Sequence, residues 1–210
     1  PLGESVDFLH AAFALMPMAP MSGRFLLLAL LAGVLAAALF LPGLGGGFML
    51  DDVHTIVQNT LICVDTLDSS SLLDAASSFD GGARPLAMLS FALDYWRGGS
   101  VDAATFKATN LAIHALTTFC LALLLHRLLV LASWSPRRAV IGALLMAFVW
   151  AVHPLQVSAV LYVVQRMQTL STLFLVLALW AYLGLRQAQI AGRRGWPQGL
   201  LALLPSSSNA

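Results

Sequence analysis

Four apolar segments, separated by polar ones, constrain the fold of this chain more than any other feature. They lie near 25–41, 104–131, 139–152 and 170–185. A helix that spans the hydrocarbon core of a bilayer needs about 20 residues, with a lower limit near 17. The first segment just meets that limit, the second exceeds it, the third is short and the fourth is marginal. The sequence therefore predicts an all-α integral membrane protein with about four transmembrane helices.

The composition agrees with this class. Of the 210 residues, 59% are hydrophobic and 10% are charged, and the mean hydropathy is +0.84. Soluble domains carry about 25% charged residues. The net charge of +1 provides no basic field for nucleic acid. We therefore expect membrane lipids, and other membrane subunits, rather than nucleic acid as partners.

The arginines predict an orientation in the membrane. With four spans, seven of them fall on one side, and the positive-inside rule makes that side cytoplasmic. The N-terminus is then cytoplasmic, and 42–103 forms a long outer loop, in what we expect to be a bacterial inner membrane. The seven are Arg24, Arg127, Arg137, Arg138, Arg186, Arg193 and Arg194.

We divide the chain into three parts. Residues 1–23 form a cytoplasmic or interfacial segment, 24–185 a membrane module, and 186–210 a C-terminal stub and tail. A rival interpretation makes 21–40 a cleavable signal peptide, since Arg24 precedes the apolar run and small residues follow. We favour a retained membrane helix, because the rest of the chain is itself typical of a membrane protein.

The outer loop holds eight of the ten acidic residues and has helical patterns of its own. Long ordered loops are usually functional. We expect a short helix over 51–61 with Asp51 or Asp52 as its N-cap, and another over 71–79 with Asp74 in its first turn. The pattern at 84–96 is amphipathic and suits the membrane interface. A further helix is expected to begin at Pro154 and run toward the fourth span.

Asp51 and Asp52 are the first candidates for chemistry. Adjacent carboxylates repel, so a partner, a metal or a raised pKa is expected to neutralise one of them. They are interpreted either as a general base beside a substrate or divalent-metal ligand, or as a helix cap with solvated acids. On the pattern alone the second interpretation is at least as strong.

A polar stripe formed by Lys107, Asn110 and His114 follows in the second apolar segment. Their spacing places them on one helix face, which must face a bundle interior or a cavity in a membrane. They form either the wall of a substrate pocket or hydrogen-bonding contacts between helices.

Arg84 and Arg166 are outer basic residues flanked by apolar helix. Paired N–H groups match phosphate geometry, so one or both are candidates to bind a lipid phosphate. The alternatives are a snorkelling anchor or a salt bridge to a loop aspartate. His153, before Pro154, is a weaker candidate, since a histidine at a helix end is more often structural.

These residues occur in an order that resembles a known family. The sequence Phe48-Met49-Leu50-Asp51-Asp52 is followed by Arg84-Pro85-Leu86, Asn110 with His114, His153-Pro154, and Gln165-Arg166-Met167. From about Arg24 to Leu185 the chain is similar to the N-terminal part of the transmembrane, tetratricopeptide-repeat glycosyltransferases of the GT-C superfamily, including their O-mannosyltransferase branch.

The resemblance implies a membrane enzyme that takes a sugar from a polyprenyl-phosphate carrier on the outer face. Asp51 would be the catalytic base, with Asp52 beside it, and the outer arginines would hold the carrier phosphate. Two departures weaken this. Ser158 stands where many relatives have glutamate, and relatives continue through more spans and helical repeats, so we expect a truncated module.

Three hypotheses follow. The chain is a glycosyltransferase module, or a non-catalytic scaffold subunit derived from a glycosyltransferase fragment, or half of a transporter. A transporter predicts broken helices at matching positions in two halves, which the sequence lacks. We favour the glycosyltransferase module, with the scaffold subunit as the alternative.

Overall fold

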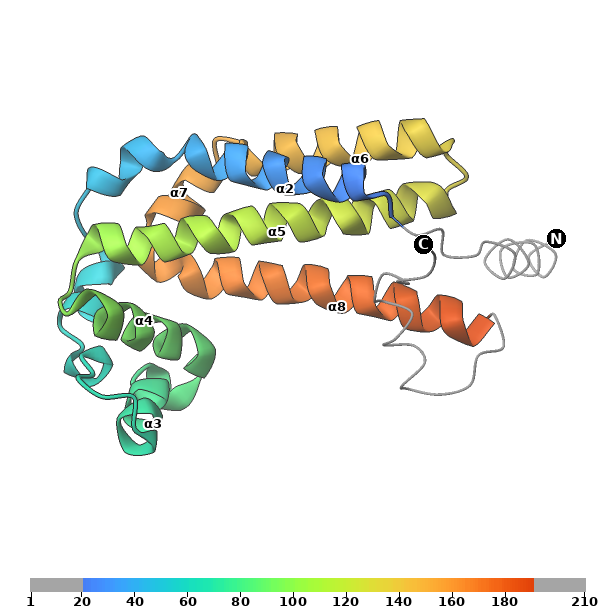
Figure 1. Ribbon diagram of the computed structural model, residues 1–210. Coiled ribbons are helices and arrows are strands. Elements are labelled where there is room, and N and C mark those ends of the chain that lie inside the picture. The colour runs from blue at the N-terminus through green and yellow to red at the C-terminus, as the bar shows by residue number, and fades with distance from the viewer. Residues whose placement is uncertain (1–20, 191–210) are drawn as a thin grey trace.

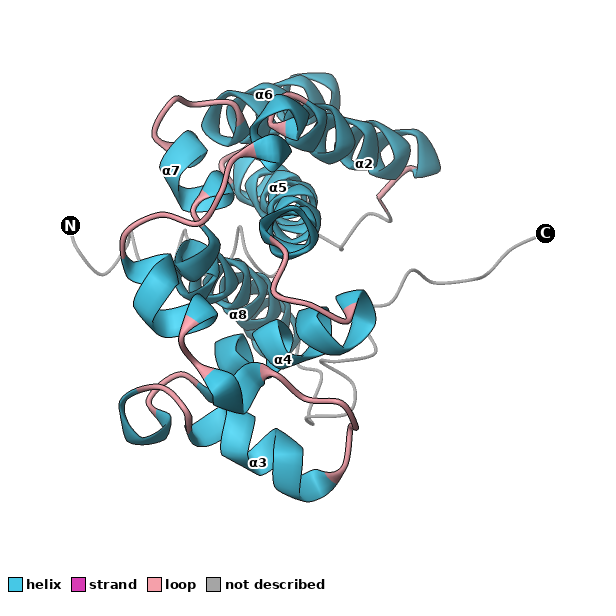
Figure 2. Ribbon diagram, turned by 90° about the vertical axis from the view of Figure 1, so that its left-hand side faces the viewer, coloured by secondary structure: helices cyan, strands magenta, loops and turns pink. Residues whose placement is uncertain are grey.

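The computed structural model describes residues 21–190, and every regular element in that range is helical. Four long helices run side by side: α2 (Gly23–Ala38), α5 (Ala103–Leu131), α6 (Pro136–Ala151) and α8 (Arg166–Ile190) (Figure 1). Helix α5 packs against the other three. Seen from one end, it lies between the α2–α6 pair and α8 (Figure 2). The described part of the chain is therefore a bundle built around α5.

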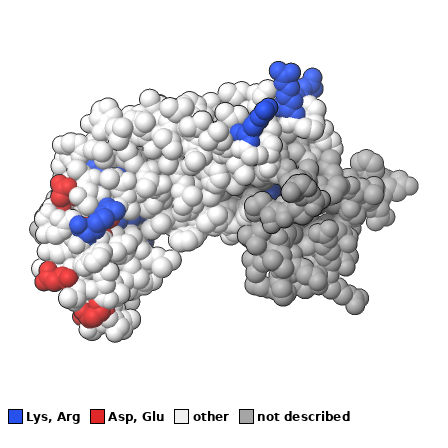
Figure 3. Space-filling model, viewed as in Figure 1, with Lys and Arg blue, Asp and Glu red and all other residues white. Residues whose placement is uncertain are grey.

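The chain direction alternates through this bundle. As a result, the two segments that connect α2 to α5 and α6 to α8 lie at the same end (Figure 1). Acidic side chains gather at that end beside basic ones, while the opposite end shows basic side chains (Figure 3). We call the acidic end the loop end. It holds 42–103 and 152–165.

Two helical segments are long and apolar enough to cross a membrane, Ala103–Leu131 and Val163–Gln189. Helices α2 and α6 have 16 residues each, below the usual length of a span. Helix length thus supports two of the four expected spans, and the count of four stays a prediction. The last span is also longer than the expected 170–185. It begins at Val163 and includes Arg166, a charged residue that hydropathy alone would exclude.

Large apolar side chains cover the outside of the bundle, while alanines lie at the contacts among α2, α5 and α6. Leu27, Leu31 and Leu35 of α2 are exposed. The buried face of α6 consists of alanines at every fourth position, and all four are fully buried: Ala139, Ala143, Ala147 and Ala151. An apolar exterior over small-residue contacts is typical of membrane helix packing.

The loop end is a layer of short helices. Its two longer helices are α3 (Ser69–Ser77) and α4 (Pro85–Gly98). The shorter elements are η1 (Leu41–Gly45), η2 (Val53–Val57), η3 (Thr60–Ile62), η4 (Asp80–Gly82), α7 (Gln156–Leu161) and η5 (Val163–Gln165). A buried core that includes Ile56, Met88, Phe91, Phe106 and Val163 joins this layer to α5 and α8.

Two of the three helices expected in the loop differ in detail from the structure. In place of one helix over 51–61 there is a π-helical turn and then a 3₁₀ turn, and Asp52 makes no capping hydrogen bond. Helix α3 begins earlier than expected, because Asp68 caps it by accepting a hydrogen bond from the Ser71 amide. Asp74 is therefore past its first turn. The amphipathic helix expected at 84–96 is present as α4.

The helix expected to run from Pro154 into the last span is interrupted. Its backbone turns extended at Tyr162 (φ −92°, ψ 114°), between α7 and η5. The break frees backbone carbonyls at Val160, Tyr162 and Val163, and the Asn110 side chain of α5 lies within hydrogen-bonding distance of all three. The sequence of this segment carries no Gly or second Pro that would have indicated the break.

Candidate functional site at the loop end

Arg166 is the centre of a buried polar network where α4, α5 and α8 meet. The side chain is fully buried, and each guanidinium nitrogen has a partner. Nε donates to Asn110 Oδ1 at 2.7 Å, Nη1 to Ser90 Oγ at 3.2 Å, and Nη2 to the Phe106 carbonyl at 2.6 Å. The guanidinium also stacks over Phe91, 4.4 Å from the ring centroid. Protein groups therefore already bind all three nitrogens of the guanidinium.

Asp94 supplies the countercharge to Arg166. Its carboxylate is 2% exposed and lies 2.6 Å from Arg166 Nη2. The other carboxylate oxygen accepts from Arg97 Nη2 at 2.9 Å and from Thr109 Oγ1 at 2.6 Å. The sequence analysis did not single out Asp94. The signal was present, because Asp94 falls on the same face of α4 as the buried Ala87 and Phe91, at spacings of seven and three.

The polar stripe of α5 makes contacts between elements. Lys107 is 3% exposed, and Nζ donates to the Gly46 carbonyl at 2.6 Å and to the Gly43 carbonyl at 3.3 Å. His114 Nε2 lies 3.0 Å from the Ala151 carbonyl at the end of α6. Together with Asn110, these side chains tie α5 to η1, to the α7–η5 break and to α6. Their predicted role in binding substrate stays a prediction.

The paired aspartates have opposite environments. Asp52 is 1% exposed, and its carboxylate accepts from the Met49 amide at 3.1 Å and from the Val164 amide at 2.7 Å. Asp51 is exposed, and its backbone N–H donates to Tyr162 Oη at 2.9 Å. The two contacts to 162–164 fix the backbone under Asp51 and leave its carboxylate at the surface.

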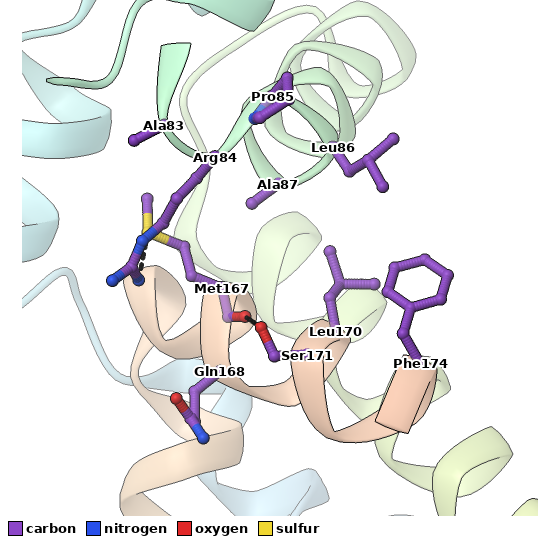
Figure 4. Close-up of a pocket in the computed structure, with 10 residues that line it drawn as sticks. All are labelled: Ala83, Arg84, Pro85, Leu86, Ala87, Met167, Gln168, Leu170, Ser171 and Phe174. Carbon is purple, nitrogen blue, oxygen red and sulfur yellow. Dashed lines mark hydrogen bonds between the residues drawn. The ribbon is translucent and has the colours of Figure 1, made fainter. Parts of the chain in front are cut away.

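Arg84 stands at the mouth of an open groove of about 370 Å³ between α4 and α8. Figure 4 shows its guanidinium beside the thioether of Met167, where Nη1 lies 3.2 Å from Sδ. The guanidinium also lies 5.6 Å from the centroid of the Phe79 ring. Among the described residues, no carboxylate lies within ion-pair distance of Arg84. Its charge therefore differs from that of Arg166 in having no neutralising partner.

The remaining candidate, His153, and one capping residue, Asp102, lie outside these groups of contacts. His153 is exposed, and its Nδ1 accepts a hydrogen bond from the Leu155 amide at 3.3 Å. Asp102 caps α5, and the hydrogen bonds from the Thr105 amide and hydroxyl lower the pKa of its carboxyl. Both arrangements are local to a helix start.

The described residues contain no group of three or more His, Cys, Asp or Glu side chains placed to hold a metal ion. At the aspartate pair, Asp52 already accepts two backbone hydrogen bonds, which leaves Asp51 as a single free carboxylate. A divalent cation usually takes several oxygen ligands. The pair therefore does not fit a divalent-metal site.

These features define a class: a helical membrane protein with a polar, hydrogen-bonded layer at one end of its bundle. Comparison with known proteins narrows it. The chain is similar to protein O-mannosyl-transferase Tmtc2 of Drosophila melanogaster, with 32% identity over 158 residues, or 71% of the chain. It is 31% identical to Drosophila Tmtc1 over 84% of the chain, and 29% identical to tmtc2 of Xenopus laevis over 73%.

The chain spans only 16% to 20% of the length of these curated relatives. No family model matches the chain, and no solved structure matches it. The similarity supports a glycosyltransferase-like membrane protein, in agreement with the resemblance seen in the sequence. All three relatives are animal proteins, so they lend no support to the expected bacterial membrane.

Proposed function

We propose that this chain forms a membrane module of a GT-C-type glycosyltransferase that uses a polyprenyl-phosphate-linked sugar at the loop end. The observation that carries the proposal is the exposed carboxylate of Asp51 on a backbone held by Tyr162 and Asp52. A base of this kind must be both accessible and positioned. The names of the relatives, protein O-mannosyl-transferases, favour mannose as the sugar and a protein hydroxyl as the acceptor.

In the proposed reaction, the acceptor hydroxyl attacks the anomeric carbon of the sugar. A new carbon–oxygen bond forms there as the bond to the carrier phosphate breaks. Asp51 takes the proton of the hydroxyl, and the carrier leaves as a lipid monophosphate that keeps the bonding electrons. Arginine stabilises the negative charge that grows on this phosphate as it leaves.

The proposal places the loop end on the outer face of the membrane, with α2 and α6 as two further spans. The arginines at the other end support this orientation through the positive-inside rule. In this arrangement the short helices α2 and α6 lie beside the central span α5. Their exposed leucines would face lipid.

The test compares Asp51→Asn with Asp52→Asn in membranes that contain the full protein. We expect Asp51→Asn to lower transfer from polyprenyl-phosphate mannose by about 100-fold or more, because general-base catalysis contributes about that much. Its thermal stability should not change. Asp52→Asn should lower stability, because the buried carboxylate accepts two backbone hydrogen bonds.

Asp65→Asn is the matched control, because Asp65 is an exposed acid of the same layer. Transfer by Asp51→Asn at the rate of Asp65→Asn would show that Asp51 is not the base. Native mass spectrometry of the extracted protein, with lipids retained, tests the wider proposal. A bound polyprenyl phosphate is the expected result.

A second function, a non-catalytic scaffold subunit, is favoured by a different observation. The buried side chains of Arg166, Asn110, Lys107 and His114 all make hydrogen bonds within the chain, as they would if they served packing alone. This function predicts stoichiometric retention of the chain in a larger assembly, with no bound polyprenyl phosphate and no effect of Asp51→Asn on any transfer reaction.

A further inference from the structure

The two outer arginines differ in what their charges are free to do. Arg166 is fully buried, and Asp94, Asn110, Ser90 and Phe106 occupy its nitrogens. Arg84 is exposed, and among the described residues the only hydrogen-bond acceptor of its guanidinium is the thioether of Met167. A thioether is a weak acceptor and carries no charge. Arg84 can therefore take an anionic ligand without breaking an ion pair.

The groove beside Arg84 is polar at one end and apolar at the other. Gln168 and Ser171 project from α8 near Arg84, while Leu170 and Phe174 extend the wall along α8 away from it (Figure 4). The volume of about 370 Å³ falls at the lower end of the range for small-molecule sites. A groove of this shape fits an anionic head joined to a hydrocarbon chain.

The backbone also favours an anion at the polar end. The first turn of α4 lines the groove, and in the described part of the chain no acceptor pairs with the amides of Leu86 or Ala87. The first turns of α8, from Met167 onward, line the opposite wall. The start of a helix carries partial positive charge. The start of α4 and one uncompensated guanidinium thus meet at the same place.

The apolar end of the groove continues onto the outer surface of the molecule. Phe174 is 48% exposed and faces outward from α8, the second of the two long apolar helices. Leu86, Leu93 and Trp96 of α4 are exposed as well, at spacings of seven and three that place them on one face. Such a face is typical of a helix that lies at a membrane interface. The groove would then open toward the head groups and the outer part of the hydrocarbon.

We propose that the groove between α4 and α8 binds the lipid-phosphate carrier, with the phosphate on Arg84 and the prenyl chain along Leu170 and Phe174. This inference rests on the proposed function and deepens it, because it assigns the carrier phosphate to Arg84 and not to Arg166. Arg166 is instead a positioning residue, which holds α8 against α4 and α5 and so sets the walls of the groove.

The experiment measures binding of a polyprenyl monophosphate to the full protein in detergent by native mass spectrometry. We expect Arg84→Gln to weaken binding by roughly tenfold or more, as loss of charge-assisted hydrogen bonds does. Phe174→Ala should weaken binding by a smaller factor, because only part of the apolar contact is lost. The polyprenol without its phosphate should bind no better to the wild type than to Arg84→Gln.

Two control variants make the same kinds of substitution at positions outside the groove. Arg137→Gln removes an exposed arginine at the opposite end of the bundle, and Leu175→Ala shortens an exposed apolar side chain of α8 outside the groove. Both should bind the polyprenyl monophosphate as the wild type does. Equal losses in Arg137→Gln and Arg84→Gln would overturn the inference, since binding would then follow net charge.

A second comparison separates the carrier from bulk lipid. Phosphatidylglycerol also has an anionic phosphate, but it carries two acyl chains. If it binds as tightly as the polyprenyl monophosphate and depends equally on Arg84, the groove is a general phospholipid site and the inference is wrong. Because this readout is binding, it is independent of Asp51: inactive Asp51→Asn with normal lipid binding supports both proposals, and active Asp51→Asn contradicts the base alone.

Discussion

The loop end and the helix bundle are held together by different kinds of interaction. At the loop end, Arg166, Asp94 and Asn110 connect three helices through directional hydrogen bonds and an ion pair between residues far apart in sequence. Along the bundle, α2, α5 and α6 meet through small residues such as Ala29, Ala122 and Ala147, all fully buried. Directional hydrogen bonds and an ion pair hold the first region together, and close packing of small residues holds the second together.

The difference has a physical reason in each environment. In a membrane, helices gain little from hiding apolar surface, so close contact between small residues becomes important. At the loop end, water is close, and buried polar groups need partners to offset their loss of solvation. Substitutions in the two regions should therefore have different effects, and the sizes of these effects can test the comparison.

The largest effect is expected for Arg166→Met. Removing one member of a buried ion pair leaves the other charge uncompensated, which costs about 3 to 5 kcal/mol of unfolding free energy. Arg97→Met is the matched control, because Arg97 pairs with the same Asp94 but its side chain is 57% exposed. That substitution should cost less than about 1 kcal/mol. Denaturing-detergent titration in mixed micelles provides both values.

A second variant distinguishes charge from shape at this junction. Arg166→Met combined with Asp94→Asn removes both charges and should recover part of the loss of the single variant, because no isolated charge stays buried. If Arg166→Met costs no more than Arg97→Met, the loop end is held mainly by its apolar core, and the contrast with the bundle disappears.

In the bundle, we expect a loss of stability when a substitution overpacks a close contact between helices. A Cβ added at Gly33 of α2 would lie 2.5 Å from the backbone oxygen of Ala115 in α5, and neither backbone can move alone. Gly33→Ala should therefore destabilise the protein by about 1 to 3 kcal/mol. Gly23, in the same helix, has no atom within 4 Å of an added Cβ. Gly23→Ala is the control and should be neutral or slightly stabilising.

The same unfolding titration measures this pair. Helix crosslinking between cysteines placed on α2 and α5 adds a structural readout, since a displaced α2 should form the crosslink more slowly. Equal stability of the two glycine variants would mean that α2 packs more loosely on α5 than the structure shows, and that shape does not determine this region.

Sequence reasoning predicted the bundle better than the loop end. The apolar segments located α2, α5, α6 and the last span, because the composition of a membrane helix is itself the signal. The polar stripe of α5 was recognised, and the structure gives its members partners between elements. The start of the last span was missed, because Arg166 becomes tolerable there only through partners on α4 and α5.

The partners of the site residues could not be predicted, for reasons that concern distance along the chain. Asp52 accepts from an amide 112 residues later, and Asp51 donates to a hydroxyl 111 residues later. No local pattern records such pairs. As a consequence, the paired aspartates looked equivalent in the sequence, whereas the fold buries one and exposes the other. Likewise, Arg84 and Arg166 looked equivalent in the sequence, whereas the fold exposes the first and buries the second.

The smallest effect concerns α3, at the edge of the loop end. Hydrogen bonds from Ser70, Ser71 and Thr66 lower the pKa of the Asp68 carboxyl well below its ordinary value near 3.8. A group whose pKa is lowered by folding stabilises the folded state above its unfolded pKa, and that contribution is lost as the pH falls. Helix α3 should therefore exchange its amide hydrogens faster, after correction for the intrinsic rate, as the pH falls below about 4 and toward the lowered pKa of the folded state.

Asp68→Asn separates the charge from the cap. Asparagine caps helices about as well as aspartate, so α3 should persist in this variant while its exchange loses most of the pH dependence. The buried network around Arg166 should show no change in either case, because Asp68 contacts only residues of its own turn. A pH-dependent loosening that spread to α4 and α8 would instead mean that the loop end unfolds as one unit, so that its directional contacts reach the edge of the layer.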